Sequence, residues 1–349
     1  MTLPPPRQLA TRMGRSLSFS SLGFGAAPLG NMHRVLDEAE AQATVRAAWA
    51  SGLRFFDTAP LYGHGLSEQR IGEALRGENR DSYLLSTKIG RLLAPGAPGE
   101  EDSGIFVRTT HNRIVYDYSY DGVMRSHEAS LRRLGLGRVD ILLVHDIDAV
   151  THGSVERSEA HIRALVDGGG WRALDELRRA GAISAVGAGL NEWQLSERLL
   201  GLLDPDVFLL AGRYTLLEQT ALDSFLPACS ARGVGVIIGG PFNSGVLATG
   251  PISGAMYNYA PAPPWVIEKA AALQAACSRH GVTLAQAALQ FPLGCPSVVS
   301  IIPGGQTASE VERNVATLGQ PVPAALWSEL KAEGLLRADA PVPTETAPC

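Results

Sequence analysis

The sequence predicts an α/β fold, a single (β/α)8 barrel of the TIM type, and two observations predict it. Short runs of strand-forming apolar residues alternate with segments that have the apolar spacing of amphipathic helices, and eight such pairs follow one another. Several apolar runs end in a polar residue, which is where such barrels carry their functional side chains. We expect residues 21–335 to form the barrel, between a flexible tail at residues 1–20 and a C-terminal tail at residues 336–349.

Each expected element is placed by an apolar run, a helix cap or a glycine stop. A short hairpin around residues 17–25 is expected before the barrel, and Ser67 is the expected N-cap of the second helix. Strands are expected at residues 25–30, 53–57, 82–88, 139–145, 183–189, 206–212, 234–240 and 297–305. Helices are expected at residues 38–50, 67–75, 121–135, 170–181, 191–203, 221–233, 263–281 and 307–319.

One connection is too long for an ordinary loop between a strand and a helix. Residues 89–119 join the third strand to its helix, whereas most such loops have two to six residues. On this fold the insert would lie over the mouth of the barrel. It carries a set of basic and aromatic residues, namely Arg91, Phe106, Arg108, His111, Arg113, Tyr116 and Tyr118.

Composition and charge narrow the classes of partner. Of the 349 residues 45% are apolar and 19% charged, and the formal net charge is −5, which disfavours nucleic acid as a partner. No apolar run approaches the roughly 18 residues that span a bilayer, and the N-terminus lacks the apolar core of a signal peptide. We therefore expect a cytoplasmic protein with a small-molecule substrate and no membrane partner; the oligomeric state is left open. The cysteines and histidines show no metal-ligand spacing, so no metal is expected.

Four polar residues, each expected at or just after the carboxyl end of a buried strand, are the candidate catalytic group. They are Asp57, Tyr62, Lys88 and His145. Together they would act on a carbonyl: the phenol supplies the proton, the ammonium lowers the phenol's pKa, the carboxylate holds the ammonium, and the imidazole orients the oxygen. An ammonium about 4 Å from a phenolate contributes roughly 4 kcal/mol at an effective dielectric of 20. Taken singly, these residues are better explained by a salt bridge and core packing; the set favours catalysis.

The segments that carry this group resemble the aldo-keto reductases. The motif "GLRFFDTAPLYGHGLSEQRIGEAL" is the most specific, and "YLLSTKIGR", "RLGLGRVDILLVHD" and "IIPGGQTASEVERNV" follow in the family's order. Within the family, "IIGGPFNSGVLATG" and "NYAPAPPWV" are similar to sugar dehydrogenases that oxidise L-fucose and D-threo-aldoses, a branch related to enzymes that oxidise pyridoxal or L-galactose. The resemblance implies a barrel enzyme that uses a nicotinamide dinucleotide.

The glycine turn after the eighth strand is the expected cofactor site. No Rossmann or P-loop fingerprint is present, whereas a turn followed by a helix N-terminus suits phosphate at this place in a barrel. The resemblance places Gly304, Gly305 and Gln306 in the adenosine-phosphate turn and Asn314 at the adenine. Glu310 falls where NADP-specific relatives usually carry a basic residue. Because a carboxylate repels a 2′-phosphate, we expect NAD, with NADP possible; alternatively, Glu310 only caps its helix.

The remaining contacts are also implied by the resemblance. Asn191 is the expected ligand of the nicotinamide amide, and Tyr214 a candidate to cover the ring. The expected contacts on the pyrophosphate side are Phe242, Asn243 and Ser244, and Gly240 and Pro241 are further candidates for cofactor binding. Candidates for the substrate pocket are His64, Trp193, Tyr257 and Tyr259.

The expected reaction is NAD-dependent oxidation of the C1 hydroxyl of an aldose to a lactone, with Tyr62 as the base. Two alternatives have related chemistry: oxidation of pyridoxal through its hemiacetal, and NADPH-dependent reduction of an aldehyde or ketone. A remote alternative is a redox-sensing binding subunit that keeps the four polar residues without turnover.

Overall fold

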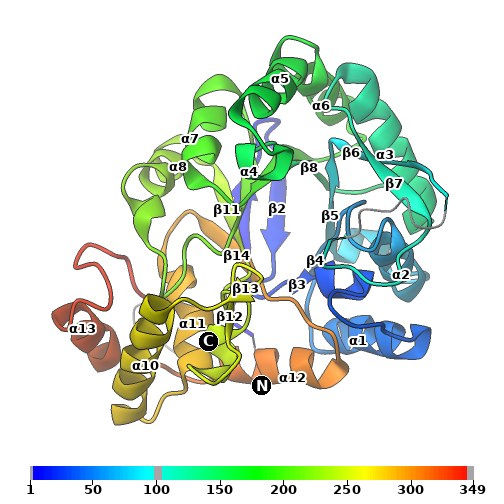
Figure 1. Cartoon of the computed structure of the whole chain (residues 1–349). Coiled ribbons are helices and arrows are strands. Elements are labelled where there is room, and N and C mark those ends of the chain that lie inside the picture. The colour runs from blue at the N-terminus through cyan, green and yellow to red at the C-terminus, as the bar shows by residue number, and fades with distance from the viewer. Residues whose placement is uncertain (1–2, 98–103, 344–349) are drawn as a thin grey trace.

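The computed structural model describes residues 3–97 and 104–343 and has the expected barrel at its centre (Figure 1). One eight-stranded parallel sheet runs in the order β14-β11-β10-β9-β8-β5-β4-β3. Parallel bridges from Leu22 to Ile301 and from Gly25 to Gly304 bring its two edges together. The strands are β3 (Phe24–Gly25), β4 (Phe55–Asp57), β5 (Leu84–Ile89), β8 (Ile141–His145), β9 (Ala185–Leu190), β10 (Val207–Ala211), β11 (Gly235–Gly239) and β14 (Val298–Ile302).

Helices surround the barrel, and several of them are capped by local side chains. Asp37, Ser119 and Thr307 each accept a hydrogen bond from a backbone N–H in the first turn of the helix that follows. The helices are α1 (Glu38–Ala50), α2 (Leu66–Ala74), α3 (Tyr120–Leu134), α6 (Gly170–Arg179), α7 (Trp193–Leu202), α8 (Phe225–Arg232), α10 (Pro264–Arg279), α11 (Leu284–Gln290), α12 (Ala308–Leu318) and α13 (Ala324–Ala332).

Two local predictions were wrong. Ser67 does not cap α2, because the helix begins at Leu66 and the Ser67 hydroxyl donates to the carbonyl of Ala26, 2.8 Å away. The strand expected at residues 25–30 ends at Gly25, and a 3-10 helix, Ala27–Gly30, follows. Pro28 lacks the N–H that a strand would use, so it suits the start of a helical turn instead.

Connections that were expected as loops contain further elements. The insert after β5 includes an antiparallel hairpin, here called the mouth hairpin, of β6 (Arg91–Pro95) and β7 (Asn112–Tyr116). Two short helices, α4 (Ala149–His152) and α5 (Val155–Val166), follow β8. Between β11 and α10 lie α9 (Val246–Thr249) and a small hairpin of β12 (Met256–Tyr257) and β13 (Ala260–Pro261).

The flexible N-terminal tail was also a wrong prediction. Within residues 1–20, strands β1 (Arg7–Ala10) and β2 (Ser16–Phe19) pair antiparallel, earlier than the hairpin expected at residues 17–25. Leu9, Leu17 and Phe19 are buried in the same cluster as the inward-facing residues of the barrel strands. The hairpin therefore closes the amino-terminal end of the barrel, where burial of apolar surface stabilises it.

Part of the expected C-terminal tail is also packed. Leu336 and Ala340 are buried, and the backbone N–H of Arg337 donates to the side chain of Gln219. Residues 344–349 lie outside the described part of the chain.

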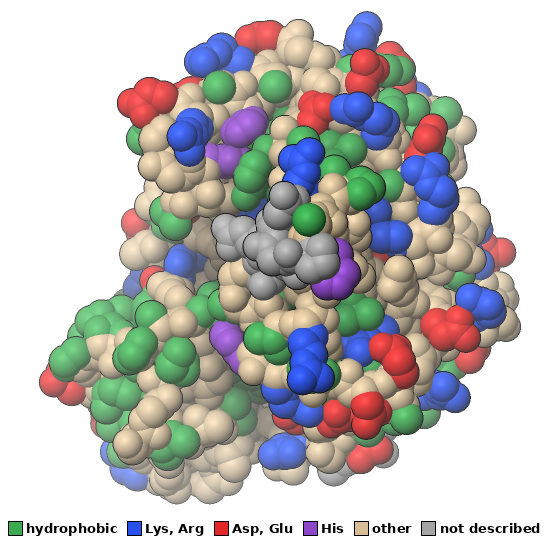
Figure 2. Space-filling view, turned by 45° about the vertical axis from the view of Figure 1, so that its right-hand side comes forward, with side chains coloured by type: hydrophobic (Ala, Val, Ile, Leu, Met, Phe, Trp, Pro, Cys, Tyr) green, Lys and Arg blue, Asp and Glu red, His purple; other side chains and the backbone are tan. Residues whose placement is uncertain are grey.

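The surface carries charges of both signs. On the face in Figure 2, lysine and arginine side chains are interspersed with acidic ones, and no broad field of one sign is visible. In the described residues, no helix combines the length and the apolar character needed to cross a bilayer.

Candidate active site

The parallel register brings the four candidate catalytic residues together at the carboxyl end of the barrel. Asp57 ends β4, Lys88 lies near the end of β5 and His145 ends β8. Tyr62 follows β4 in a tight turn, in which its C=O accepts the N–H of Ser67. Their roles stay a prediction, but their convergence is a property of the fold.

Lys88 is the centre of the group. Its Nζ lies 2.7 Å from Asp57 Oδ2, 3.0 Å from the Tyr62 hydroxyl and 3.0 Å from the carbonyl of Thr58. The other oxygen of Asp57 accepts the hydroxyl of Ser86 at 2.6 Å. The Lys88 and Asp57 side chains are 2% and 3% exposed, so this is a dry ion pair with its hydrogen bonds satisfied.

The pKa of Tyr62 differs from the expectation. Burial raises the pKa of Tyr62 to about 12, and the neighbouring Lys88 ammonium offsets only part of that increase. Burial alone would lower the pKa of Lys88, but Asp57 and Tyr62 outweigh it and raise that pKa above its ordinary value. In the ligand-free protein, therefore, desolvation outweighs the charge of Lys88, and Tyr62 is a protonated phenol at neutral pH.

His145 stands beside Tyr62 as a neutral imidazole. The two rings lie 5.8 Å apart, edge to face. Burial, together with the Arg91 and Lys88 cations, holds the pKa of His145 well below its usual range. A neutral imidazole has one N–H, which can donate to a substrate oxygen.

The mouth hairpin is fixed to this site. Arg91 pairs with Asp146 at 2.8 Å, and Phe106 packs 6.0 Å from the ring of Tyr62. His64, expected in the substrate pocket, is fully buried, and its Nδ1 lies 2.5 Å from the carbonyl of Asn112 in β7. His64 therefore anchors the hairpin and does not line an open pocket.

Three other aromatic candidates are packed or hydrogen-bonded within the fold. Tyr214 is fully buried, 5.1 Å from Phe291, so it cannot cover a ring bound at the mouth. Tyr257 is buried with its hydroxyl bonded to Glu218, and the indole of Trp193 donates to Thr220. These contacts correct the first prediction and disfavour the other two, because side chains committed to packing present little surface to a ligand. Tyr259 is 55% exposed, with its ring 6.3 Å from that of His33, and stays a candidate at the rim.

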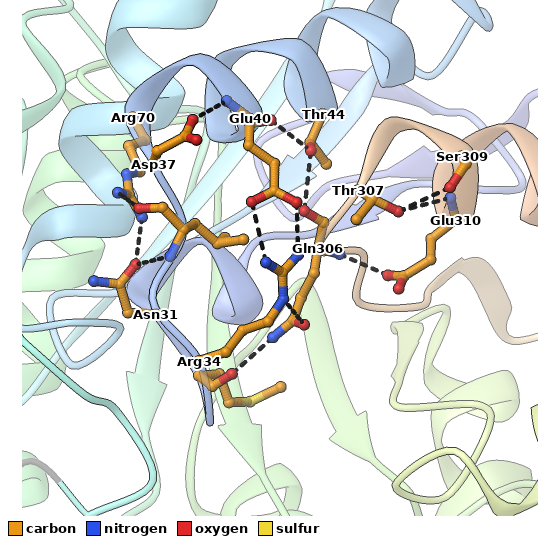
Figure 3. Close-up of polar contacts among 12 residues, drawn as sticks. Asn31, Arg34, Asp37, Glu40, Thr44, Arg70, Gln306, Thr307, Ser309 and Glu310 are labelled. Carbon is orange, nitrogen blue, oxygen red and sulfur yellow. Dashed lines mark hydrogen bonds and ion pairs between the residues drawn. The ribbon is translucent and has the colours of Figure 1, made fainter.

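The turn after β14 has the expected carboxylate, Glu310, and next to it a cation, Arg34, that the sequence did not indicate. Figure 3 shows Glu310 reaching back to the turn, where its Oε2 accepts the N–H of Gln306 at 2.8 Å. Glu310 therefore caps the turn through its Oε2. In the described part of the chain its other oxygen, Oε1, caps no backbone N–H. Arg34, which has no motif signal in the sequence, donates to Gln306 at 2.9 Å and to both oxygens of Glu40 at 3.1 and 2.8 Å.

The cofactor candidates lie in two turns, one after β14 and one after β11. Gly305 and Asn314 line a recess beside Phe24 and Val311, and a Cβ on Gly305 would come within 3.1 Å of Val311. At the end of β11, Asn243 is 4% exposed, and its Oδ1 has no partner in the described structure. Such an orphaned acceptor, in a turn with left-handed residues at Gly240, Asn243 and Ser244, is suited to a ligand's donor groups. Gly304 and Pro241 lie in the same two turns, and Phe242 packs against the core.

The comparisons with known proteins agree with this geometry. A model of the aldo/keto reductase family matches residues 21–332. Pyridoxal 4-dehydrogenase of Microbacterium luteolum is 43% identical over 339 residues, which cover 93% of this chain and 97% of the relative. D-threo-aldose 1-dehydrogenase of a Pseudomonas species is 37% identical over 320 residues, 90% of this chain and 94% of the relative. The holo structure of an aldo-keto reductase from Bacillus halodurans matches with a TM-score of 0.71 over 98% of both chains; at 24% identity it supports the fold alone.

Proposed function

Since the chain belongs to the aldo/keto reductase family and is therefore an oxidoreductase that uses NAD(P), we propose that it oxidises the hemiacetal hydroxyl of a cyclic substrate to a lactone with NAD. One observation carries the proposal: a buried lysine 3.0 Å from a tyrosine hydroxyl, with a neutral histidine on the tyrosine's other side. This arrangement can take a proton from an alcohol and stabilise the resulting negative charge.

The residues of the chain account for the proton and the orientation of the substrate. Tyr62, as phenolate, accepts the proton of the hemiacetal hydroxyl, and Lys88 stabilises that phenolate from 3.0 Å. His145 donates its N–H to the same substrate oxygen and fixes its position. The carbon loses a hydride as its C–O bond becomes C=O, and the product is a lactone. When bound, oxidised nicotinamide is the hydride acceptor.

The proposed substrate is either an aldose, the first arm, or pyridoxal, the second arm, and the same chemistry would oxidise both. An aldose presents a C1 hydroxyl next to the ring oxygen, and pyridoxal forms a hemiacetal of the same kind. The 37% identity to the aldose dehydrogenase supports the first arm, whereas the 43% identity to the pyridoxal dehydrogenase supports the second. Reduction of aldehydes with NADPH is the competing direction.

The preference for NAD rests on the charge of the turn after β14. Arg34 is the cation next to Gln306, but Glu40 engages both of its terminal nitrogens. Glu310 adds a second carboxylate. One cation against two carboxylates leaves this turn negative, which disfavours a 2′-phosphate and allows a 2′-hydroxyl to donate. The nicotinamide end would lie near Asn191, with the turn at Asn243 on the pyrophosphate side.

A cytoplasmic location is part of the proposal. Cys229, Cys277 and Cys295 are free and buried, which is typical of a reducing compartment.

The test is a set of initial rates with NAD and NADP on L-fucose, D-arabinose, L-galactose and pyridoxal, with NADH absorbance as the signal. We expect NADH and a lactone, identified by mass spectrometry, either from an aldose or from pyridoxal. Absence of NADH with all four substrates, together with brisk NADPH-dependent aldehyde reduction, would contradict the proposal.

A further inference from the structure

Asp146 occupies the centre of a buried cluster that the expected catalytic group does not include. It follows His145 directly, and its side chain is only 15% exposed. Its Oδ2 lies 2.8 Å from Arg91 and 3.4 Å from His145 Nε2. Its Oδ1 accepts the side-chain amide of Asn191 at 3.0 Å. One carboxylate therefore touches the mouth hairpin, the candidate catalytic histidine and the candidate cofactor-binding asparagine.

We propose that Asp146 is a positioning residue that keeps the proton of His145 on Nε2 and turns Asn191 so that its Oδ1 is free to accept. The proposal deepens the proposed function, on which its kinetic consequences rest. Asp146 itself takes no part in the chemistry; it determines which group His145 and Asn191 present to a ligand.

The surroundings of His145 give the tautomer. Its Nδ1 is buried with no hydrogen-bond partner among the described residues, and its Nε2 lies 3.4 Å from the carboxylate. A proton on Nδ1 would leave a buried donor unpaired and aim the Nε2 lone pair at a negative charge. With the proton on Nε2, the negative charge 3.4 Å away favours the N–H without a short hydrogen bond to it, so the N–H stays available to a substrate oxygen, and the unpaired atom is an acceptor. Because the imidazole is neutral, the position of its single proton decides whether it can donate to a substrate oxygen.

The backbone of Asp146 is held in an unusual conformation. Its φ of 34° is positive, which is uncommon for a residue other than glycine, although Asp tolerates it better than most. The Tyr118 hydroxyl donates to the carbonyl of His145 at 2.8 Å and lies 3.4 Å from that of Asp146. A strained residue that its surroundings hold in place is typical of a functional site.

The charge of Asp146 depends on its neighbours. Arg91 from β6 and Lys88 from β5 favour the carboxylate, whereas Asp148 opposes it; His145 is neutral, and the hydroxyls of Tyr62 and Tyr259 also feel its charge. Burial outweighs these cations and raises the pKa of Asp146 to about 6. The carboxylate is therefore present above pH 6 and is lost as the pH falls through that value.

The decisive experiment is the substitution Asp146→Asn, with Asp148→Asn as the matched control. Asp148 is buried, at 2% exposed, and caps α4 through Thr151, a role that asparagine also fills. We expect Asp146→Asn to lower kcat at least about tenfold, as is typical for residues that orient a functional histidine. It should also remove the extra steepness that protonation of Asp146 adds, below pH 6, to the decline of kcat/KM caused by the falling Tyr62 phenolate. The control should keep the rate and the extra acid decline, displaced to a lower pH because the Asp148 charge that opposes the Asp146 carboxylate is removed. Wild-type kcat in Asp146→Asn, with the extra steepness below pH 6 still present, would overturn the proposal.

A second measurement needs no turnover. In cofactor-free protein labelled with 15N-histidine, with the signals assigned against His145→Asn, wild-type His145 should show the Nε2–H tautomer at pH 8. That signal should shift as the pH falls through 6, and in Asp146→Asn it should differ at pH 8. A His145 signal that is identical in both proteins and constant between pH 8 and 5 would refute the positioning role, even if the enzyme oxidises no tested substrate. Conversely, failure of every substrate with the expected tautomer would count against the proposed function alone.

Discussion

Two regions of the molecule each hold a cation paired with a carboxylate. One is the site at the ends of β4 and β5, and the other surrounds the turn after β14. The two pairs differ in their exposure to water. Lys88 and Asp57 lie 2.7 Å apart with side chains 2% and 3% exposed. Arg34 and Glu40 lie 2.8 Å apart with side chains 41% and 32% exposed. Burial makes the first pair a determinant of pKa and stability, whereas water screens the second. We therefore expect a buried ion pair to serve proton transfer in one region and an exposed one to serve charge selection in the other.

The largest effect expected in the buried region comes from Tyr62→Phe. Removal of the hydroxyl should lower kcat by about 10²–10⁴ while the affinity for NAD stays nearly unchanged, because the hydroxyl acts only on the substrate oxygen. Steady-state kinetics and fluorescence titration of the cofactor measure the two quantities. Tyr83→Phe, which removes a buried hydroxyl far from the site, is the control. Retention of more than about a tenth of wild-type kcat would show that Tyr62 is not the base.

Asp57→Asn should show how much burial strengthens the first pair. The substitution leaves the Lys88 ammonium without its charged partner, and we expect unfolding in urea to become easier by about 3–5 kcal/mol. Adding Lys88→Met should recover much of that loss, since the unpaired charge is removed as well. A double variant no more stable than Asp57→Asn would mean that packing, and not the charge, accounts for the cost.

The pH dependence of oxidation should follow the phenolate of Tyr62. Because burial raises the pKa of Tyr62 to about 12, the phenolate fraction grows tenfold per unit at every pH below that value. From pH 7 to 9, kcat/KM should therefore rise by roughly a hundredfold. A plateau below pH 8, measured under substrate-limited conditions, would mean that the Tyr62 pKa that governs oxidation is much lower than about 12.

In the exposed region, Glu310→Arg with Gly305→Ser should shift the cofactor preference. The change replaces repulsion of a 2′-phosphate with charge-assisted hydrogen bonds, and we expect the NADP/NAD ratio of Kd-based affinities to rise about tenfold. Glu312→Arg, which makes the same charge change on the exposed face of α12, is the control. An unchanged ratio in the first variant would show that this turn does not contact the 2′-position.

The smallest effect is expected for Glu40→Gln. Breaking the solvent-exposed pair with Arg34 should change the free energy of unfolding by at most about 1 kcal/mol. Urea unfolding in parallel with Asp57→Asn compares the two regions directly. Losses of equal size would remove the distinction drawn between the buried and the exposed pair.

The sequence by itself determined the barrel and the positions of most of its elements. The apolar runs that end at Asp57 and His145 form strands because they are short, β-branched or aromatic, and bounded by turns, which are local properties. The four polar residues could be grouped for a related reason: parallel strands end at the same face, so residues at their carboxyl ends must meet.

Only the tertiary structure decided how water and charge are distributed around those residues. Arg34 lies in no motif, and the motifs that end at Arg91 and Asp146 assign these two residues no role. The partners of the three residues lie 272, 55 and 45 residues away in the chain, at Gln306, Asp146 and Asn191. Desolvation likewise depends on segments that the sequence does not show to be adjacent, such as the mouth hairpin over His64 and Tyr62. Three features therefore followed from the folded chain and not from local sequence pattern. They are the direction of the Tyr62 pKa shift, the packing of Tyr214 and the formation of the N-terminal hairpin.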